Sequence, residues 1–201
     1  LSSVVLGTNV AVIGSGAFTL CTNLVELTIP DSVRNMEGYA FDQCSSLASV
    51  TMGLGVTNIG YYAFSECANL LNAPIGAGVV SIGAYTFQDC RAMTNATIPD
   101  SVTSIGDSAF RGCENLAAIS IGDGMRYCGI GFRDLPALRS VTIGDGVLGI
   151  GDSEFRGCRA LQTVTIGNGV TEIGWEAFAD CESLSSVVLG TNVAVIGSGA
   201  F

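Results

Sequence analysis

The sequence of 201 residues contains no lysine and no histidine, so that all eight of its basic residues are arginines. Eighteen acidic residues oppose them and give a formal net charge of −10. This balance argues against nucleic-acid ligands, which need a basic surface to meet their phosphates. Without histidine or lysine the chain lacks two common general bases, and without histidine or a C-x-x-C pair it lacks the usual pattern of a zinc site. We therefore expect a protein that is not an enzyme and holds no cofactor.

Long apolar runs are missing as well. No stretch approaches the roughly 20 apolar residues that a membrane-spanning helix needs, so no membrane insertion is expected within this segment. No signal peptide opens the chain. Because the sequence starts inside a repeat, that absence says little about where the protein acts.

One feature dominates what is present, a phenylalanine that recurs at steps of 23 residues with a single step of 22. A fixed period of this length predicts a solenoid of stacked repeats, and we interpret residues 1–201 as one array of about eight and a half repeats. The repeats are numbered here by their phenylalanines, which are Phe18, Phe41, Phe64, Phe87, Phe110, Phe132, Phe155, Phe178 and Phe201.

Within each repeat the pattern predicts one strand and one helical turn. Residues 161–166 (LQTVTI) alternate apolar and polar side chains, which is typical of a strand with one buried face, and parallel strands from successive repeats would form a sheet. Residues 109–116 space their apolar side chains by three, the period of one or two turns of α-helix or 3₁₀-helix packed over that sheet. The predicted fold class is therefore α/β.

Two small residue types recur in register with the phenylalanines. A glycine follows the isoleucine of the motif in eight of nine repeats, which indicates a positive φ or a backbone too close for a Cβ. Seven of the eight cysteines lie three residues after the phenylalanine, where we expect a ladder of buried, reduced thiols. Rungs about 5 Å apart leave a disulfide between neighbours open as an alternative.

The combined pattern, L-x-x-V-x-I-P-D-S-V-T-S-I-G-D-S-A-F-R-G-C-E-N-L, resembles the BspA-like, or Treponema-type, leucine-rich repeats over the whole chain. The resemblance implies a curved solenoid of bacterial or protist cell-surface proteins, which are often adhesive toward host matrix proteins or other cells. It also implies an extracellular or cell-surface location. The scaffold itself serves many partners, so the resemblance is specific for fold rather than for function.

The first eighteen residues are repeated without a change at residues 184–201. No polar capping repeat precedes or follows them, and a solenoid normally caps its ends. We interpret the chain as a segment of a longer array or fibre that stacks end to end, since heterologous contacts propagate unless they close. The alternatives are a sequence boundary that falls across a duplication and, for function, a discrete cell-surface adhesin module that binds a host or partner protein.

Aromatic residues form the first candidate contact surface, for a lateral protein contact or a sugar. Three tyrosines lie two residues before the phenylalanines of repeats two to four, with a fourth beside them and a tryptophan one place off on a later repeat. Tyrosine offers contact area at little entropic cost, although shielding of the repeat edge is the alternative role. These residues are Tyr39, Tyr61, Tyr62, Tyr85 and Trp175.

Repeat six is irregular, because residues 125–132 have lost one residue and place Cys128 where isoleucine otherwise stands. Most of the arginines gather around it. In an acidic chain they are a candidate complement for an acidic patch on another molecule, and a solvated face is the alternative. The six residues are Arg111, Arg126, Arg133, Arg139, Arg156 and Arg159.

A column of carboxylates occupies three successive turns, at Asp100, Asp123 and Asp145. Carboxylates about 5 Å apart repel one another unless a cation screens them, so calcium is a weak candidate ligand here. The alternative is the ordinary preference of aspartate for turns.

Overall fold

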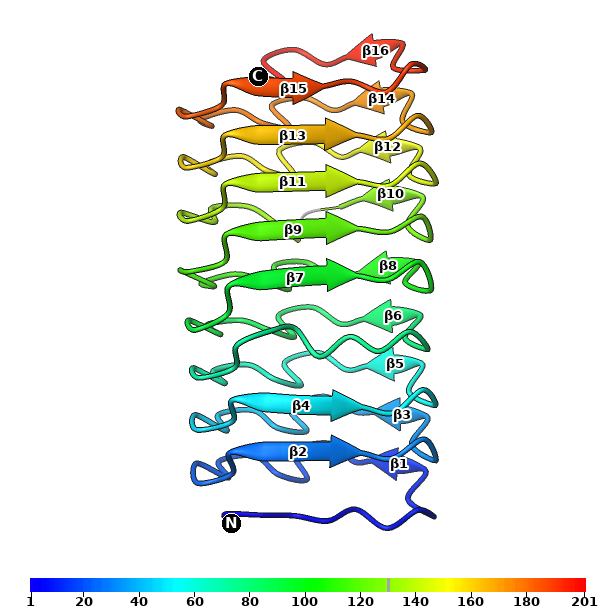
Figure 1. Ribbon diagram of the computed structural model, residues 1–201, viewed down its shortest axis with the longest axis vertical. Coiled ribbons are helices and arrows are strands. Elements are labelled where there is room, and N and C mark those ends of the chain that lie inside the picture. The colour runs from blue at the N-terminus through cyan, green and yellow to red at the C-terminus, as the bar shows by residue number, and fades with distance from the viewer. Residues whose placement is uncertain (130) are drawn as a thin grey trace.

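The computed structural model, which describes residues 1–129 and 131–201, is a parallel β-solenoid. Its rungs stack along one axis from the N-terminus to the C-terminus (Figure 1). Ile130, which belongs to the irregular stretch of repeat six, lies outside the described residues.

Each regular repeat contributes two strands, where the sequence predicted one. Each strand pairs in parallel with the equivalent strand of a neighbouring repeat. The longer strands lie on one side of the stack (Figure 1). They are β2 (Glu26–Ile29), β4 (Ser49–Met52), β7 (Asn95–Ile98), β9 (Ala118–Ile121), β11 (Ser140–Ile143), β13 (Thr163–Ile166) and β15 (Ser186–Val188). They show the predicted alternation, since Leu27 and Ile29 of β2 are buried while Glu26 and Thr28 are exposed.

The second strand of each repeat has two residues and contains the isoleucine of the motif or its substitute. These strands are β1 (Val12–Ile13), β3 (Asn35–Met36), β5 (Asn58–Ile59), β6 (Ser81–Ile82), β8 (Ser104–Ile105), β10 (Tyr127–Cys128), β12 (Gly149–Ile150), β14 (Glu172–Ile173) and β16 (Val195–Ile196). Two residues are too few to show alternation, so the pattern did not reveal them.

Both sheets are interrupted where the sequence departs from the repeat. In repeat four Pro74 lacks the N–H that a ladder needs, and on the side of the long strands the described β-pairing of this rung is an isolated bridge between Asn72 and Asn95. The long strands therefore divide into β2-β4 and β7-β9-β11-β13-β15. The short strands divide between β8 and β10, next to the one-residue deletion of repeat six.

The third side of the stack is formed in each repeat by the residues between the short strand and the next long strand, and it includes the phenylalanine of the motif. Among the described residues it contains no helix, so the predicted helical turn and the α/β class are wrong. In repeat two, Tyr39 and Gln43 have φ of 59°, and this conformation recurs two residues before and after most of the phenylalanines. A left-handed residue ends a right-handed helix. What remains is a series of turns, with N–H bonds from Asp42 to the carbonyl of Tyr39 and from Cys44 to that of Phe41.

Backbone hydrogen bonds to the next repeat explain this conformation. Tyr39, Phe41 and Gln43 donate their N–H groups to carbonyls of repeat three at 2.8–2.9 Å. Alternate residues thus form a ladder along the third side as well. The apolar spacing of three, read as helix, is the spacing of successive turns.

The core is a continuous stack of phenylalanine rings. From Phe18 to Phe201 the centroids of neighbouring rings are 5.0–5.9 Å apart, and the rings lie within 30° of parallel. The seven rings from repeats two to eight are essentially inaccessible to solvent. The stack passes through the irregular repeat six without a gap, because Phe132 lies 5.4 Å from Phe110 and 5.6 Å from Phe155.

The glycine after the isoleucine is required by close approach between repeats. A Cβ at Gly83 would lie 2.4 Å from the backbone nitrogen of Tyr61, and one at Gly106 would lie 2.3 Å from that of Ala84. Neither glycine has a positive φ. Of the two explanations that the sequence offered, the structure confirms the steric one.

The cysteine column is a ladder of free thiols with a definite role. Six thiols donate to the carbonyl of the phenylalanine in the preceding repeat at 3.2–3.4 Å, from Cys44, Cys67, Cys90, Cys113, Cys158 and Cys181. Burial is the main cause that raises the pKa of Cys44 to about 11 and that of Cys113 to about 12. These thiols therefore stay protonated at neutral pH, as weak donors within the core.

Candidate functional site

The tyrosine column lies on the third side of the stack, beside the phenylalanine core. The rings of Tyr39 and Tyr62 stack at 5.0 Å and 6°, and those of Tyr62 and Tyr85 at 4.8 Å and 13°. Tyr61 packs edge-on against Tyr39 at 5.2 Å, where Gly38 leaves room for its ring. The structure therefore brings all four predicted tyrosines together.

All three column tyrosines adopt the left-handed conformation, with φ between 54° and 59°. This conformation costs on the order of 1 kcal/mol or more for a residue with a side chain. Offset-stacked aromatic pairs return about 0.5–1.5 kcal/mol each. Ser108 and Ser153 occupy the same place in repeats five and seven at φ of 55° and 57°. The backbone therefore does not require tyrosine there.

The stacking decides which parts of the rings can meet a ligand. Tyr62 has a ring stacked on each of its faces and so presents its edge and hydroxyl group, while Tyr39 and Tyr85 each have one face covered by Tyr62. Tyr39 is 38% exposed and Tyr61 is 51% exposed. Sugars usually pack on open aromatic faces, whereas ring edges with hydroxyl donors suit a protein surface. The geometry favours a protein contact over a sugar.

Trp175 is half-exposed but does not join this cluster. It shares the repeat position of Tyr61, five repeats further along the stack. At about 4.8 Å per rung the two are roughly 24 Å apart. The predicted aromatic set is thus one cluster and one isolated residue.

The predicted arginine patch is also divided. Arg111, Arg133 and Arg156 each follow their phenylalanine directly and form one column on the third side. Arg156 is neutralised by Glu176 and Asp180, the second at 3.2 Å. Arg159 pairs with Glu182 at 3.5 Å. Arg126 and Arg139 precede β10 and β11 and so lie elsewhere in the repeat.

A hollow of about 240 Å³ lies on the third side at the irregular repeat. Its walls are Ser108 and Arg111 of repeat five and Gly131, Arg133 and Asp134 of repeat six. It adjoins the tyrosine column, since Tyr85 donates its N–H to the carbonyl of Asp107 at 3.1 Å. Arg111 lies near enough for its charge to lower the pKa of Tyr62, which desolvation and the neighbouring tyrosines raise.

Glu154 is a residue that the sequence reading missed. It stands directly before Phe155, a place that alanine holds in six repeats, and its side chain is inaccessible to solvent. Oε1 accepts the N–H of Gly131 at 3.3 Å, while Oε2 has no partner among the described residues. Burial raises the pKa of Glu154 to about 8. A charged residue in an alanine column was the signal that could have revealed it.

Each aspartate of the column links its own turn to the turn of the next repeat, because its carboxylate accepts a backbone N–H there. Oδ1 of Asp100 accepts the N–H of Asp123 at 2.9 Å, and Oδ1 of Asp123 accepts that of Gly146 at 3.1 Å. Asp145 repeats the contact with Asn168 at 2.6 Å. Among the residues described, no group of three or more acidic or cysteine residues is placed to hold a metal ion. These hydrogen bonds give the column a role that needs no calcium.

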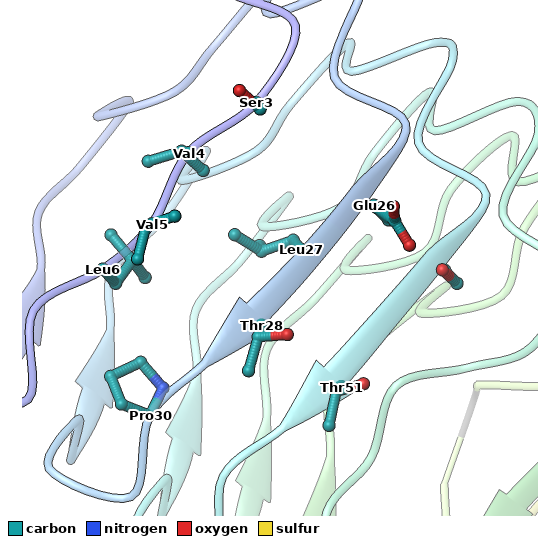
Figure 2. Close-up of a pocket in the computed structure, with 10 residues that line it drawn as sticks. Ser3, Val4, Val5, Leu6, Glu26, Leu27, Thr28, Pro30 and Thr51 are labelled. Atoms are coloured by element: carbon teal, nitrogen blue, oxygen red, sulfur yellow. The ribbon is translucent and has the colours of Figure 1, made fainter.

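At the N-terminal end a groove of about 390 Å³ runs between the first rung and the long sheet. Figure 2 shows Val4, Val5 and Leu6 on one side of it and Leu27 and Pro30 on the other. Residues 3–5 form no strand with β2, although the identical residues in β15 pair with β13. The same sequence is therefore paired in one rung and unpaired in the other.

The fold and these surfaces can be compared with known proteins. The profile of the BspA type leucine rich repeat region matches residues 1–117 and 80–201, in six copies. The chain belongs to the BspA-type leucine-rich repeat family. A leucine-rich repeat protein of Treponema pallidum is 29% identical, with a TM-score of 0.65 over 88% of this chain and 72% of that one.

Other solved structures extend the likeness of this BspA-type chain. A leucine-rich repeat protein of Bacteroides ovatus is 24% identical, with a TM-score of 0.51 over 96% of this chain and 67% of that one. The pneumococcal vaccine antigen PcpA is 17% identical, with a TM-score of 0.46 over 94% of this chain and 64% of that one. No curated protein matches the chain.

Family membership narrows what the BspA-type chain can do. Leucine-rich repeat solenoids typically act as protein-interaction modules rather than as enzymes, and the exposed tyrosine column fits such a role. In residues 1–129 and 131–201 no helix is both long and apolar enough to span a bilayer.

Proposed function

We propose that this chain is a segment of an extracellular structural and adhesive protein, in which repeats stack end to end into a long array. The observation that carries the proposal is the identity of residues 1–18 with residues 184–201, which places one sequence in both end rungs of the stack. Phe18 and Phe201 both continue the aromatic stack, at 5.0 Å from Phe41 and 5.3 Å from Phe178. A further repeat added at either end would therefore contact a rung of the same sequence and could continue the ring stack.

The apolar character of the terminal rungs supports this stacking. Ile196 and Phe201 are each about half-exposed. Each has a counterpart that is buried or intermediate in the inner repeats, such as Ile173 for Ile196 and Phe178 for Phe201. Continuation of the stack, within a longer polypeptide or between molecules, would remove these surfaces from water. Such burial stabilises the assembly by about 25 cal/mol per Å² of apolar surface.

Sedimentation velocity over a concentration series tests the stacking. We expect the weight-average sedimentation coefficient of the 201-residue chain to rise with concentration, because each added molecule exposes a new end of the same kind. Phe201→Asp should abolish the rise while leaving the fold intact, since it places a charge on one end rung only. A single sedimenting species at all concentrations would contradict end-to-end stacking and favour a discrete module.

The second candidate function is a discrete cell-surface adhesin that binds a host or partner protein through the tyrosine column. The observation that favours it is that three tyrosines adopt an unfavourable left-handed backbone conformation. Other repeats have the smaller residues glycine or serine at this position with the same conformation. A protein-contacting edge is one reason to keep them. A surface location is supported by the family and by the description of PcpA as a vaccine antigen.

The triple variant Tyr39→Ser, Tyr62→Ser, Tyr85→Ser separates the two roles of this surface. We expect it to fold, because Ser108 and Ser153 hold the same φ in the native chain. Lateral association, measured as filament width by electron microscopy, should fall while filament length is kept. Exposed Trp175→Ser is the matched control and should change neither quantity. Unchanged width in the triple variant would mean that the column only shields the repeat edge.

A further inference from the structure

The irregular repeat borders a hollow on the third side of the stack. Three residues rather than four lie between Cys128 and Phe132, and Phe132 nevertheless keeps its place in the ring stack. Gly131 replaces the usual alanine, and the hollow opens beside it on the third side of the stack.

Glu154 of repeat seven contacts Gly131 of this hollow, because its Oε1 accepts the N–H of Gly131 at 3.3 Å. Its carboxyl group lies under Gly131, and a Cβ on Gly131 would be 4.0 Å from Oε1. Burial raises the pKa of Glu154 to about 8, Arg133 and the Gly131 N–H lower it, and Asp107 raises it. At neutral pH the carboxyl group is mostly protonated and adds little negative charge beneath the hollow.

The walls of the hollow carry positive charge without an internal counter-ion. No carboxylate of the described residues lies within 4.0 Å of the guanidinium groups of Arg111 or Arg133, whereas Arg156 of the same column has two acidic partners. Asp134 also lines the hollow, but its carboxylate reaches toward repeat seven, where a Cβ at Gly157 would lie 2.2 Å from Oδ1. Gly157 makes room for it.

We propose that the hollow binds a carboxylate side chain of an acidic peptide segment on a protein partner, held between the guanidinium groups of Arg111 and Arg133. Arginine matches a carboxylate with two parallel N–H donors. The inference rests on the proposed role as a protein-interaction module, and it makes the hollow a specificity site beside the tyrosine column. A polyanion such as a sulfated sugar is disfavoured, because the chain as a whole has a net charge of −10.

An NMR titration of the dilute, unassembled 201-residue chain tests this site. The probes are the capped peptides acetyl-Gly-Asp-Gly-amide and acetyl-Gly-Asn-Gly-amide, and sodium sulfate at equal ionic strength. The aspartate peptide should shift the amide signals of Ser108, Gly131 and Arg133 in a saturable way. The asparagine peptide should bind about tenfold more weakly or not at all, because it lacks the charge.

Two double variants of equal net charge provide the comparison. Arg111→Gln with Arg133→Gln should weaken the aspartate peptide by about tenfold or more, whereas Arg91→Gln with Arg159→Gln, which alters exposed and already paired arginines, should not. Equal weakening in both variants, or no saturable shift, would overturn the site. Tighter binding of sulfate than of the aspartate peptide would assign the hollow to sulfated ligands instead. Stacking is measured separately by sedimentation, so either idea can fail alone.

Discussion

Replacement of Phe110 by alanine should lower the free energy of unfolding by about 3–5 kcal/mol. Its ring is fully buried between Phe87 at 5.2 Å and Phe132 at 5.4 Å, so the change removes contacts with two neighbouring repeats at once. In a solenoid each repeat is stabilised mainly by its neighbours, and a cavity in the middle of the stack therefore weakens two interfaces. Urea unfolding followed by circular dichroism measures the loss.

Tyr61→Ala is the matched control for this prediction. It also deletes an aromatic ring, but from a position that is 51% exposed, and should cost about 1 kcal/mol or less. Hydrogen exchange can locate the effect, because amide protection should fall most in repeats four to six of the Phe110→Ala chain. A loss at Phe110 no larger than the loss at Tyr61 would contradict the ring stack as the core of the fold.

The period of the sequence was sufficient to predict the solenoid, the buried phenylalanines and the cysteine ladder. These features repeat in every rung, so the burial of one predicts the burial of all. For the glycines after the isoleucines the sequence left two explanations open, a positive φ or a close backbone approach, and Gly83 and Gly106 show the second. The features confirmed are those in which local pattern and packing agree.

The prediction of a helical turn was wrong because an apolar spacing of three residues is compatible with two structures. It is the period of a short helix and also the spacing of successive turns, such as those that end at Cys44 and Leu47. What separates them is the left-handed backbone at Tyr39 and Gln43, which local preference disfavours for both residue types. Hydrogen bonds to the next repeat impose that conformation, and they are not visible in one repeat alone.

The candidate contact surfaces were predictable in part, to the extent that they follow the register. Tyr39, Tyr62 and Tyr85 share one register position and meet, whereas Trp175 lies five repeats beyond Tyr61 and stays apart. The arginine patch was drawn from nearness in sequence, which does not place residues on one side of a rung. The hollow depends on how the chain absorbs a deletion, and that is a property of packing rather than of pattern. The binding roles of these residues remain predictions.

Glu154 should make the stability of the protein depend on pH between about 4.5 and 8. Its pKa is raised from an ordinary value of 4.5 to about 8, chiefly by burial. Across this window the folded chain holds a proton that the unfolded chain has released, so the folded state binds more protons and stability falls as pH rises. The full loss is on the order of 4 kcal/mol and is complete above the folded pKa. The buried thiols act in the same direction only above about pH 9, near the ordinary pKa of cysteine.

Urea unfolding at pH 5, 6, 7 and 8 tests this dependence with two glutamine variants. Glu154→Gln removes the titrating group but keeps an oxygen that can accept the N–H of Gly131, so it should lose most of the pH slope and exceed the wild type in stability at pH 8. Glu182→Gln, at a glutamate whose side chain is 68% exposed, should keep the wild-type slope. A wild-type slope in Glu154→Gln would mean that the carboxyl group is already ionised at neutral pH. It would then have to be paired or hydrated in solution, and a negative charge would lie next to Gly131 of the arginine hollow.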